Sequence, residues 1–280
     1  MRDFPQELVD QVIDELYDLV GASNDYPPPS GRYRRSSSHV HGIADYSLVS
    51  RAWVGPTQKH HFNTLRIYCP SLLYTWRKRI RPDPTGVSRL VRKLSLEMAY
   101  YEDLEKFGEH LRALTRVKCL TFESCMDALH HPSLMEWFLT TGSSLVELRI
   151  NDSLVSPHTI ASLLAQLPLL YRLEIIDFDT PDDANDTKPP DPLRIPFFEG
   201  RSCFAWHPRH NRNYPESSLE WIPPSARFAR LEVDMTSTLG QLDLVDRWLA
   251  SSCTTLTSLA ILTRAGTSHQ SDLVYIDQSR

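Results

Sequence analysis

The sequence predicts an α/β protein in which a three-helix N-terminal module precedes an irregular solenoid of right-handed strand–helix repeats with a curved parallel sheet. Two observations predict this. Short apolar-x-apolar triplets recur at a nearly constant step from residue 64 onward, with helical stretches between them. The first 62 residues lack the repeat and carry apolar residues at helical spacing instead. The chain has 280 residues, 41% of them hydrophobic and 23% charged, which suffices to bury the core of such an array.

The N-terminal module begins with an amphipathic helix for which Asp3 is the expected N-cap. Its apolar face is expected to consist of Phe4, Leu8, Val12 or Ile13, and Leu16. Its other face carries Glu7, Asp10, Asp14, Glu15 and Asp18. Residues 21–42 are rich in Gly, Pro and Ser and predict a flexible loop. Two further helices are expected, a short one through Leu48-Val49 and one from about Trp53 to Phe62, with Pro56 close to its first turn.

The triplets predict the strands of the second domain. They are Leu65/Ile67, Leu94/Leu96, Leu120/Phe122, Leu148/Ile150, Leu173/Ile175, Leu231/Val233 and Leu259/Ile261. Consecutive triplets lie 25 to 29 residues apart, except for one step of 58, which is two periods. Apolar residues at helical spacing fill the intervals at Leu104/Phe107/Leu111/Leu114, Leu134/Trp137/Phe138, Ile160/Leu163/Leu164/Leu167 and Leu242/Val245/Trp248/Leu249. Residues 273–276 predict a last strand.

A period in the twenties is typical of leucine-rich repeats, in which each unit supplies one strand and one helix and is stable only when stacked on its neighbours. The Asn expected after the repeat core is mostly missing, and Asn151 is the exception. The doubled step predicts a Pro/Asp-rich insertion over residues 178–227, with one cryptic strand around Cys203–Trp206. The expected domains are residues 1–62 and 63–280. No polar terminal cap is evident, so a longer natural protein and a shortened paralogue both stay open.

The N-terminal residues resemble the F-box family. The matching residues are Phe4-Pro5-x-Glu7-Leu8, Ile13, Leu16 and Ser47-Leu48-Val49-Ser50-Arg51-Ala52-Trp53. With its degenerate leucine-rich repeats and Pro-rich interruptions, the chain is similar to the expanded F-box-like families of mushroom-forming fungi. The departures are Phe4 in place of the usual leucine and a longer loop at residues 21–42, which costs little because closure entropy grows with the logarithm of length.

The resemblance implies a substrate-receptor subunit of a cullin–RING (SCF-type) ubiquitin ligase. The N-terminal helices would bind a Skp-type adaptor, and the repeats would bind a target protein. The expected adaptor-binding residues are Phe4, Pro5, Leu8, Leu48, Val49 and Trp53. The alternative is that Leu8, Ile13, Leu16 and Val49 form the core of the module itself. The alternative function is a leucine-rich-repeat interaction scaffold with no ligase link.

Strand residues that alternate with the buried triplet positions would face the concave side of the solenoid, because successive side chains of a strand point to opposite faces. These substrate-binding candidates are Arg66, Ser95, Glu97, Thr121, Glu123, Arg149, Asn151 and Glu174, followed by Glu232 and Asp234. A basic stretch next to the first strands could bind an acidic partner, or could form a solvated surface. It consists of Arg77, Lys78, Arg79, Arg81, Arg89, Arg92 and Lys93.

The sequence favours no catalysis, cofactor or metal. It contains no P-loop, GxSxG, HExxH or GxGxxG motif, and Cys203-x3-His207-x2-His210 lacks a fourth ligand at recognisable spacing. The His60-His61 doublet is expected to face solvent or to cap a helix. Five scattered cysteines indicate reduced thiols and a cytoplasmic or nuclear protein. A net charge of −5 does not favour nucleic acid, and no run approaches the roughly 18 apolar residues that span a bilayer.

Overall fold

A computed structural model describes residues 5–21, 51–67, 86–97, 108–123, 132–151, 157–176, 195–207, 222–234, 242–264 and 271–277. The chain divides into two compact units, Met1–Leu65 and Arg66–Arg280. Of the predicted segments, the loop at residues 21–42 falls almost wholly outside the described residues, and so do residues 177–194 and 208–221 of the predicted insertion.

The first unit is built on two helices, α1 (Gln6–Gly21) and α3 (Arg51–His61), which precede strand β1 (Thr64–Ile67). The helix α1 begins at Gln6, and the carbonyl of Pro5 accepts hydrogen bonds from the backbone N–H groups of Leu8 (3.1 Å) and Val9 (3.3 Å). Asp3, the expected N-cap, lies outside the described residues. Val9 and Ile13 are 2% and 1% exposed, and they supply the buried row of this helix.

Pro56 explains one contact between the two helices. We expected it near the first turn of its helix, but α3 begins at Arg51, so Pro56 lies in the helix interior. A proline there has no N–H to donate to the carbonyl four residues earlier, which is that of Ala52. The side-chain amide of Gln6 on α1 donates to this carbonyl instead, at 3.0 Å. The missing backbone donor thus creates an acceptor that ties α1 to α3.

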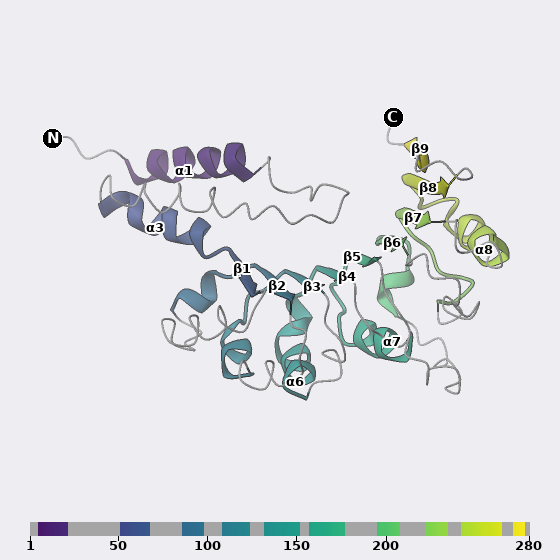
Figure 1. The fold of residues 1–280 in the computed structure, drawn as a ribbon, viewed down its shortest axis with the longest axis horizontal. Coiled ribbons are helices and arrows are strands. Elements are labelled where there is room, and N and C mark those ends of the chain that lie inside the picture. Colours follow the sequence, from purple (N-terminus) through teal and green to yellow (C-terminus); the bar gives the residue numbers. More distant parts are fainter. Residues whose placement is uncertain are drawn as a thin grey trace. The chain divides into compact units, whose positions relative to one another are not determined.

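The second unit contains one sheet whose strands follow in chain order from β1 at one edge to β9 at the other (Figure 1). The strands are β2 (Lys93–Glu97), β3 (Cys119–Glu123), β4 (Glu147–Asn151), β5 (Arg172–Ile176), β6 (Cys203–His207), β7 (Arg230–Asp234), β8 (Ser258–Arg264) and β9 (Ser271–Asp277). Strands β2 to β8 pair in parallel, and β9 pairs antiparallel to β8. The predicted last strand at residues 273–276 is therefore confirmed. The parallel sheet confirms the predicted α/β class.

Helices connect the parallel strands, as parallel pairing requires. They are α6 (Pro132–Thr141), α7 (Pro157–Ala165), α8 (Leu242–Ser252), a helical turn over residues 108–113, and the 3-10 turns η1 (Val87–Leu90), η3 (Gly142–Ser144) and η5 (Pro196–Phe198). The helices α6, α7 and α8 lie on one side of the sheet (Figure 1). The helices predicted in the intervals after Leu120, Leu148 and Leu231 are confirmed.

The strand register aligns the predicted triplets into two columns that run across the sheet. The first column is Leu94, Leu120, Leu148, Leu173, Phe204, Leu231 and Leu259, and the second is Leu96, Phe122, Ile150, Ile175, Trp206, Val233 and Ile261. Every member of β2 to β7 in these columns is buried. Strand β6 divides the doubled step of 58 residues into 31 and 27, which confirms the cryptic strand expected around residues 203–206.

Hydrogen bonds fix this register at the amino end of the strands. The carbonyl of Arg92 accepts from the N–H groups of Lys118 (2.7 Å) and Cys119 (3.0 Å), and the carbonyl of Lys118 accepts from those of Val146 (2.8 Å) and Glu147 (3.0 Å). The same paired acceptance recurs at the carbonyls of Val146, Ser202 and Ala229, which precede β4, β6 and β7. The carbonyl of Tyr171, before β5, accepts one hydrogen bond, from the N–H of Cys203 (2.8 Å).

The predicted insertion contributes to the core. Its described part supplies β6 and several buried aromatic side chains, which join others from β7 and α8. Phe204 stacks on Phe228 with ring centroids 5.4 Å apart, and both rings meet Trp248 edge to face at 6.2 and 5.9 Å. Phe197 and Phe198 on η5 are 3% and 6% exposed and contact Phe228 from the other side of the cluster.

Candidate functional site

The first unit exposes an apolar row on α1. Leu8 and Val12 are 46% and 41% exposed, and Pro5 at the start of the helix is also exposed. The alternative prediction, that these residues form the core of the module itself, is therefore wrong for Leu8. It is confirmed for Ile13, which is 1% exposed. The sequence placed Val12 and Ile13 as alternatives on one face. In the structure they lie on different rows, because they differ by 100° around the helix.

The other expected adaptor-binding residues are described only in part. Trp53 on α3 is partly buried. Phe4, Leu48 and Val49 lie outside the described residues, and the side chain of Leu16 does so too. Leu8 and Pro5, with Val12 as a neighbour the prediction did not include, therefore form the described part of the candidate surface. We call these three residues the α1 apolar row.

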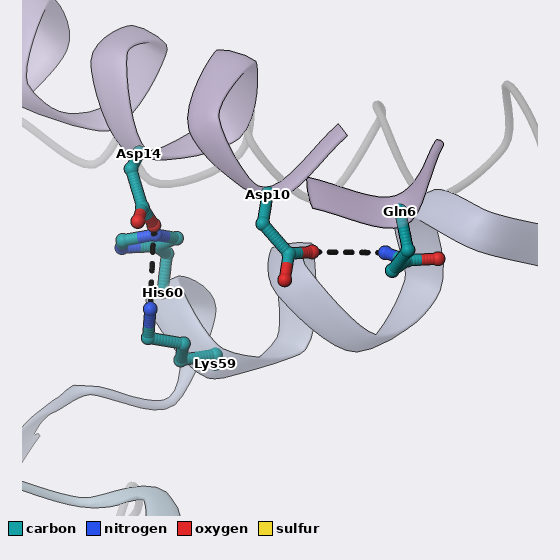
Figure 2. A network of polar contacts seen from close by, with 5 residues as sticks. All are labelled: Gln6, Asp10, Asp14, Lys59 and His60. Atoms are coloured by element: carbon teal, nitrogen blue, oxygen red, sulfur yellow. Dashed lines mark hydrogen bonds and ion pairs between the residues drawn. The ribbon is translucent and has the colours of Figure 1, made fainter. Parts of the chain in front are cut away.

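A polar network joins α1 to α3 beside the buried row (Figure 2). The side chain of Asp14 pairs with the imidazole of His60, and Lys59 contacts the same Oδ1 atom at 3.3 Å. Nearer the start of α1, Gln6 Nε2 also donates to Asp10 Oδ1 at 2.8 Å. The hydrogen bond from His60, opposed by burial and aided by Lys59, lowers the pKa of the Asp14 carboxyl.

One expectation for this network is wrong. We expected His60 to face solvent or to cap a helix. The His60 side chain is only 11% exposed because its ring lies against Asp14. Asp14 faces α3, since the neighbouring residue Ile13 anchors α1 on the same side. Sequence spacing within one helix does not show which face a second helix will cover.

The second unit presents a polar sheet face. Ser95, Thr121, Arg149 and Glu174 align in register across β2 to β5, and the column continues through Ala205, Glu232 and Ala260. Glu97, Glu123 and Asn151 align in the next column, at the carboxyl ends of the strands. Arg66 on β1 is exposed. The predicted substrate-binding residues thus share one face, and their binding role stays a prediction.

Glu174 differs from its predicted place on an open surface. Its side chain is only 7% exposed, because two guanidinium groups cover it. Arg149 from β4 pairs with its Oε2 atom and Arg172 from its own strand pairs with Oε1. Burial lowers the pKa of Arg172, but the charge and hydrogen bond of Glu174, helped by Glu147, outweigh it and raise the pKa overall. A buried carboxylate on this face is tolerated because both its oxygens are paired.

Sequence reasoning missed Arg172 and Arg230, although a signal was present. Each arginine precedes a glutamate by two residues, as Arg172-x-Glu174 and Arg230-x-Glu232. Positions two apart on a strand share a face, so the pattern places each pair side by side. The Arg230 and Glu232 side chains approach to 4.0 Å. The polar face therefore carries oriented arginines with exposures of 38% to 44%.

Cys119 and Cys203 lie at the amino ends of β3 and β6, and the surroundings of Cys119 do not favour a reactive thiolate. Burial, followed by the charge and hydrogen bond of Glu147, raises the pKa of Cys119 to about 11, so its reactive thiolate is scarce at neutral pH. The hydrogen bond with Cys203 raises the pKa of Tyr171, with their charge interaction and burial acting in the same direction. Among the described residues, no group of three or more His, Cys, Asp or Glu side chains could hold a metal ion.

No protein-family model matches the chain, and no curated protein matches it. In the described part of the chain, no helix has the length and apolar character needed to cross a membrane. The class that the fold defines is an α/β protein with a sequentially ordered parallel sheet, and its candidate sites are two surfaces.

Proposed function

We propose that this protein is a substrate receptor of a cullin–RING ubiquitin ligase. Its first unit is an F-box-like module that binds a Skp-type adaptor, and its second unit is a solenoid of degenerate leucine-rich repeats that binds the target protein. The proposal is supported by the F-box-like motif residues, by the 25–31-residue strand repeat, and by the polar face that the strands share.

The observation that carries the proposal is the α1 apolar row. An amphipathic helix buries one row of apolar residues in its own core, and α1 does so with Val9 and Ile13. Leu8 and Val12 lie outside this buried row, and both stay more than 40% exposed. An exposed pair of apolar side chains one turn apart on a helix is the form that groove-binding helices take. The adaptor would bury this row.

The decisive experiment is a pull-down of a purified Skp-type adaptor by the full chain and by the variant Leu8→Asp. Burying a leucine stabilises a complex by about 1.5–3 kcal/mol, so the variant should bind at least about tenfold more weakly. Leu8 is half exposed, so the variant should keep the wild-type circular dichroism spectrum. The matched control is Leu139→Asp, which changes a 68% exposed leucine on α6 of the second unit.

Three outcomes are informative. Capture by the wild type and by Leu139→Asp, but not by Leu8→Asp, would support the receptor. Equal loss in both variants would mean that the effect is not specific to the α1 apolar row. If the wild type captures no adaptor, the ligase link is refuted and the alternative function, a repeat scaffold without a ligase, takes its place.

A further inference from the structure

We propose that the amino edge of the sheet in the second unit binds an extended acidic peptide segment. The proposal names the substrate class of the receptor proposed above and rests on that function. The amino edge is defined as the four residues that end at the first residue of each strand from β2 to β8, namely residues 90–93, 116–119, 144–147, 169–172, 200–203, 227–230 and 255–258.

This edge is strongly basic. Its cationic residues are Arg92, Lys93, Arg116, Lys118, Arg172, Arg201, Arg227 and Arg230, and Glu147 is its one acidic residue. The carboxyl edge is the reverse: the last residues of β2, β3 and β7 are glutamate or aspartate, and none of the last residues of β2 to β7 is Lys or Arg. The whole chain has a net charge of −5, so the basic edge is not a consequence of overall composition.

The cations lie at the amino ends of five different strands and are brought together by the sheet. In the sequence, only Arg92 and Lys93 belonged to a visible basic stretch, which ended at Lys93. Parallel pairing in register places Lys93, Arg172 and Arg230 in one column across the sheet. Because neighbouring strands lie about 4.8 Å apart, the edge from β2 to β7 is about 24 Å long. An extended peptide of about seven residues has this length.

The edge is preorganised for an anion. The carbonyls that precede the strands are bonded to the next strand, so the backbone that carries the cations is fixed. The Arg92 guanidinium donates to the carbonyls of Arg89 (2.9 Å) and Arg116 (3.3 Å) and is thereby oriented. Arg172 uses one amino group on Glu174, and a guanidinium has five N–H donors in all. Oriented arginines lose less conformational freedom on binding a carboxylate than free ones do.

Positive charge at this edge is incompletely balanced. Burial, and then the positive charge of Arg116, lowers the pKa of Arg92, so bringing a carboxylate to this point would relieve the repulsion. An acidic peptide fits better than a nucleic acid, because β3 ends in the acidic residue Glu123 only about 13 Å along the strand from the basic edge. A phosphate backbone broad enough to cover the face would meet this carboxylate, whereas one peptide strand follows the basic edge alone.

The test is fluorescence anisotropy of a labelled peptide of about eight glutamates with the full chain at about 50 mM salt. The double variant Lys93→Gln/Lys118→Gln removes two exposed charges from the edge. We expect it to bind the peptide about tenfold more weakly. The matched control is Arg112→Gln/Arg247→Gln, which removes two exposed charges from the helical segments and should change binding less than about twofold.

Each remaining result overturns the proposal. Absence of peptide binding by the wild type would refute it, and equal weakening in both double variants would reduce it to a general effect of net charge. Tighter binding of a thymidine oligonucleotide of equal length would replace the peptide by a nucleic acid. The measurement needs no adaptor, so failure here leaves the pull-down result standing, and failure of the pull-down leaves this result standing.

Discussion

The aromatic cluster under β6 and β7 gives the most direct test of how the second unit is held together. Phe228 is fully buried, stacks on Phe204 at 5.4 Å, and meets Phe198 and Trp248 edge to face at 6.0 and 5.9 Å. Phe228→Ala removes the ring but leaves the backbone N–H, which donates to Ser252 Oγ at 3.0 Å. The loss is therefore one of packing, and a buried Phe→Ala change costs about 3–5 kcal/mol.

This loss should be measured by urea unfolding, followed by circular dichroism and by tryptophan fluorescence, to which the adjacent Trp248 contributes. Urea lowers the free energy of unfolding by up to about 3 kcal/mol per molar in proteins of this size, so the unfolding midpoint should fall by roughly 1–2 M urea. The loss is a large part of the total stability of a domain, which is about 5–15 kcal/mol. Leu139→Ala is the control, because this residue is 68% exposed and its change should cost less than about 0.5 kcal/mol. A Phe228→Ala variant within about 1 kcal/mol of the wild type would refute the reasoning, since the cluster would then be loose or absent.

Two further predictions concern single positions. Because the hydrogen bond from His60 lowers the pKa of Asp14, this carboxyl stabilises the first unit above its unfolded pKa near 3.8, and the contribution disappears as pH falls through the lowered value. Asp14→Asn should therefore lower the melting temperature at pH 7 and not at about pH 2, and an equal difference at both would contradict this assignment. Gly200 has φ +95 and a Cβ there would lie 2.8 Å from Thr255 Cγ2, so Gly200→Ala should cost more than about 1 kcal/mol in urea unfolding. Gly55→Ala in α3 meets nothing within 4 Å and should stabilise slightly, and the idea fails if the two variants behave alike.

Much of the second unit could be predicted because its periodicity is strong. Each apolar triplet forms a strand, and every one of β2 to β8 pairs in the register that its triplet implies. The pattern succeeds because leucine, isoleucine and phenylalanine at alternate positions leave only one face to bury. The strand at Cys203–His207 was harder to find, since Phe204 and Trp206 are both aromatic, unlike the residues of any other triplet, and the neighbouring prolines hide the period.

The candidate surfaces could be predicted less well, because they depend on contacts between elements. The sequence showed an amphipathic α1, but only the position of α3 decides that Ile13 is covered and Leu8 is not. Glu174 was expected on an open face, yet it is covered by Arg149, which comes from the strand before. Long charged side chains can lie over a neighbouring strand, and nothing in strand periodicity encodes which one does so.

The strand–helix units of the second unit stack in register, and the structure offers a physical reason. At the amino end of β2, β3, β4, β6 and β7, the carbonyl before the strand accepts from two N–H groups at the next strand, so backbone hydrogen bonds help to define the register. At the carboxyl end, Glu97, Glu123 and Asn151 occupy equivalent positions, which shows that no single side chain type is needed there for the strands to pair. If the amino ends supply the register, the residues that flank them can vary in charge without loss of the fold. We therefore expect the double variant Lys93→Gln/Lys118→Gln to keep the fold, so that a change in its peptide binding reports the loss of the two charges.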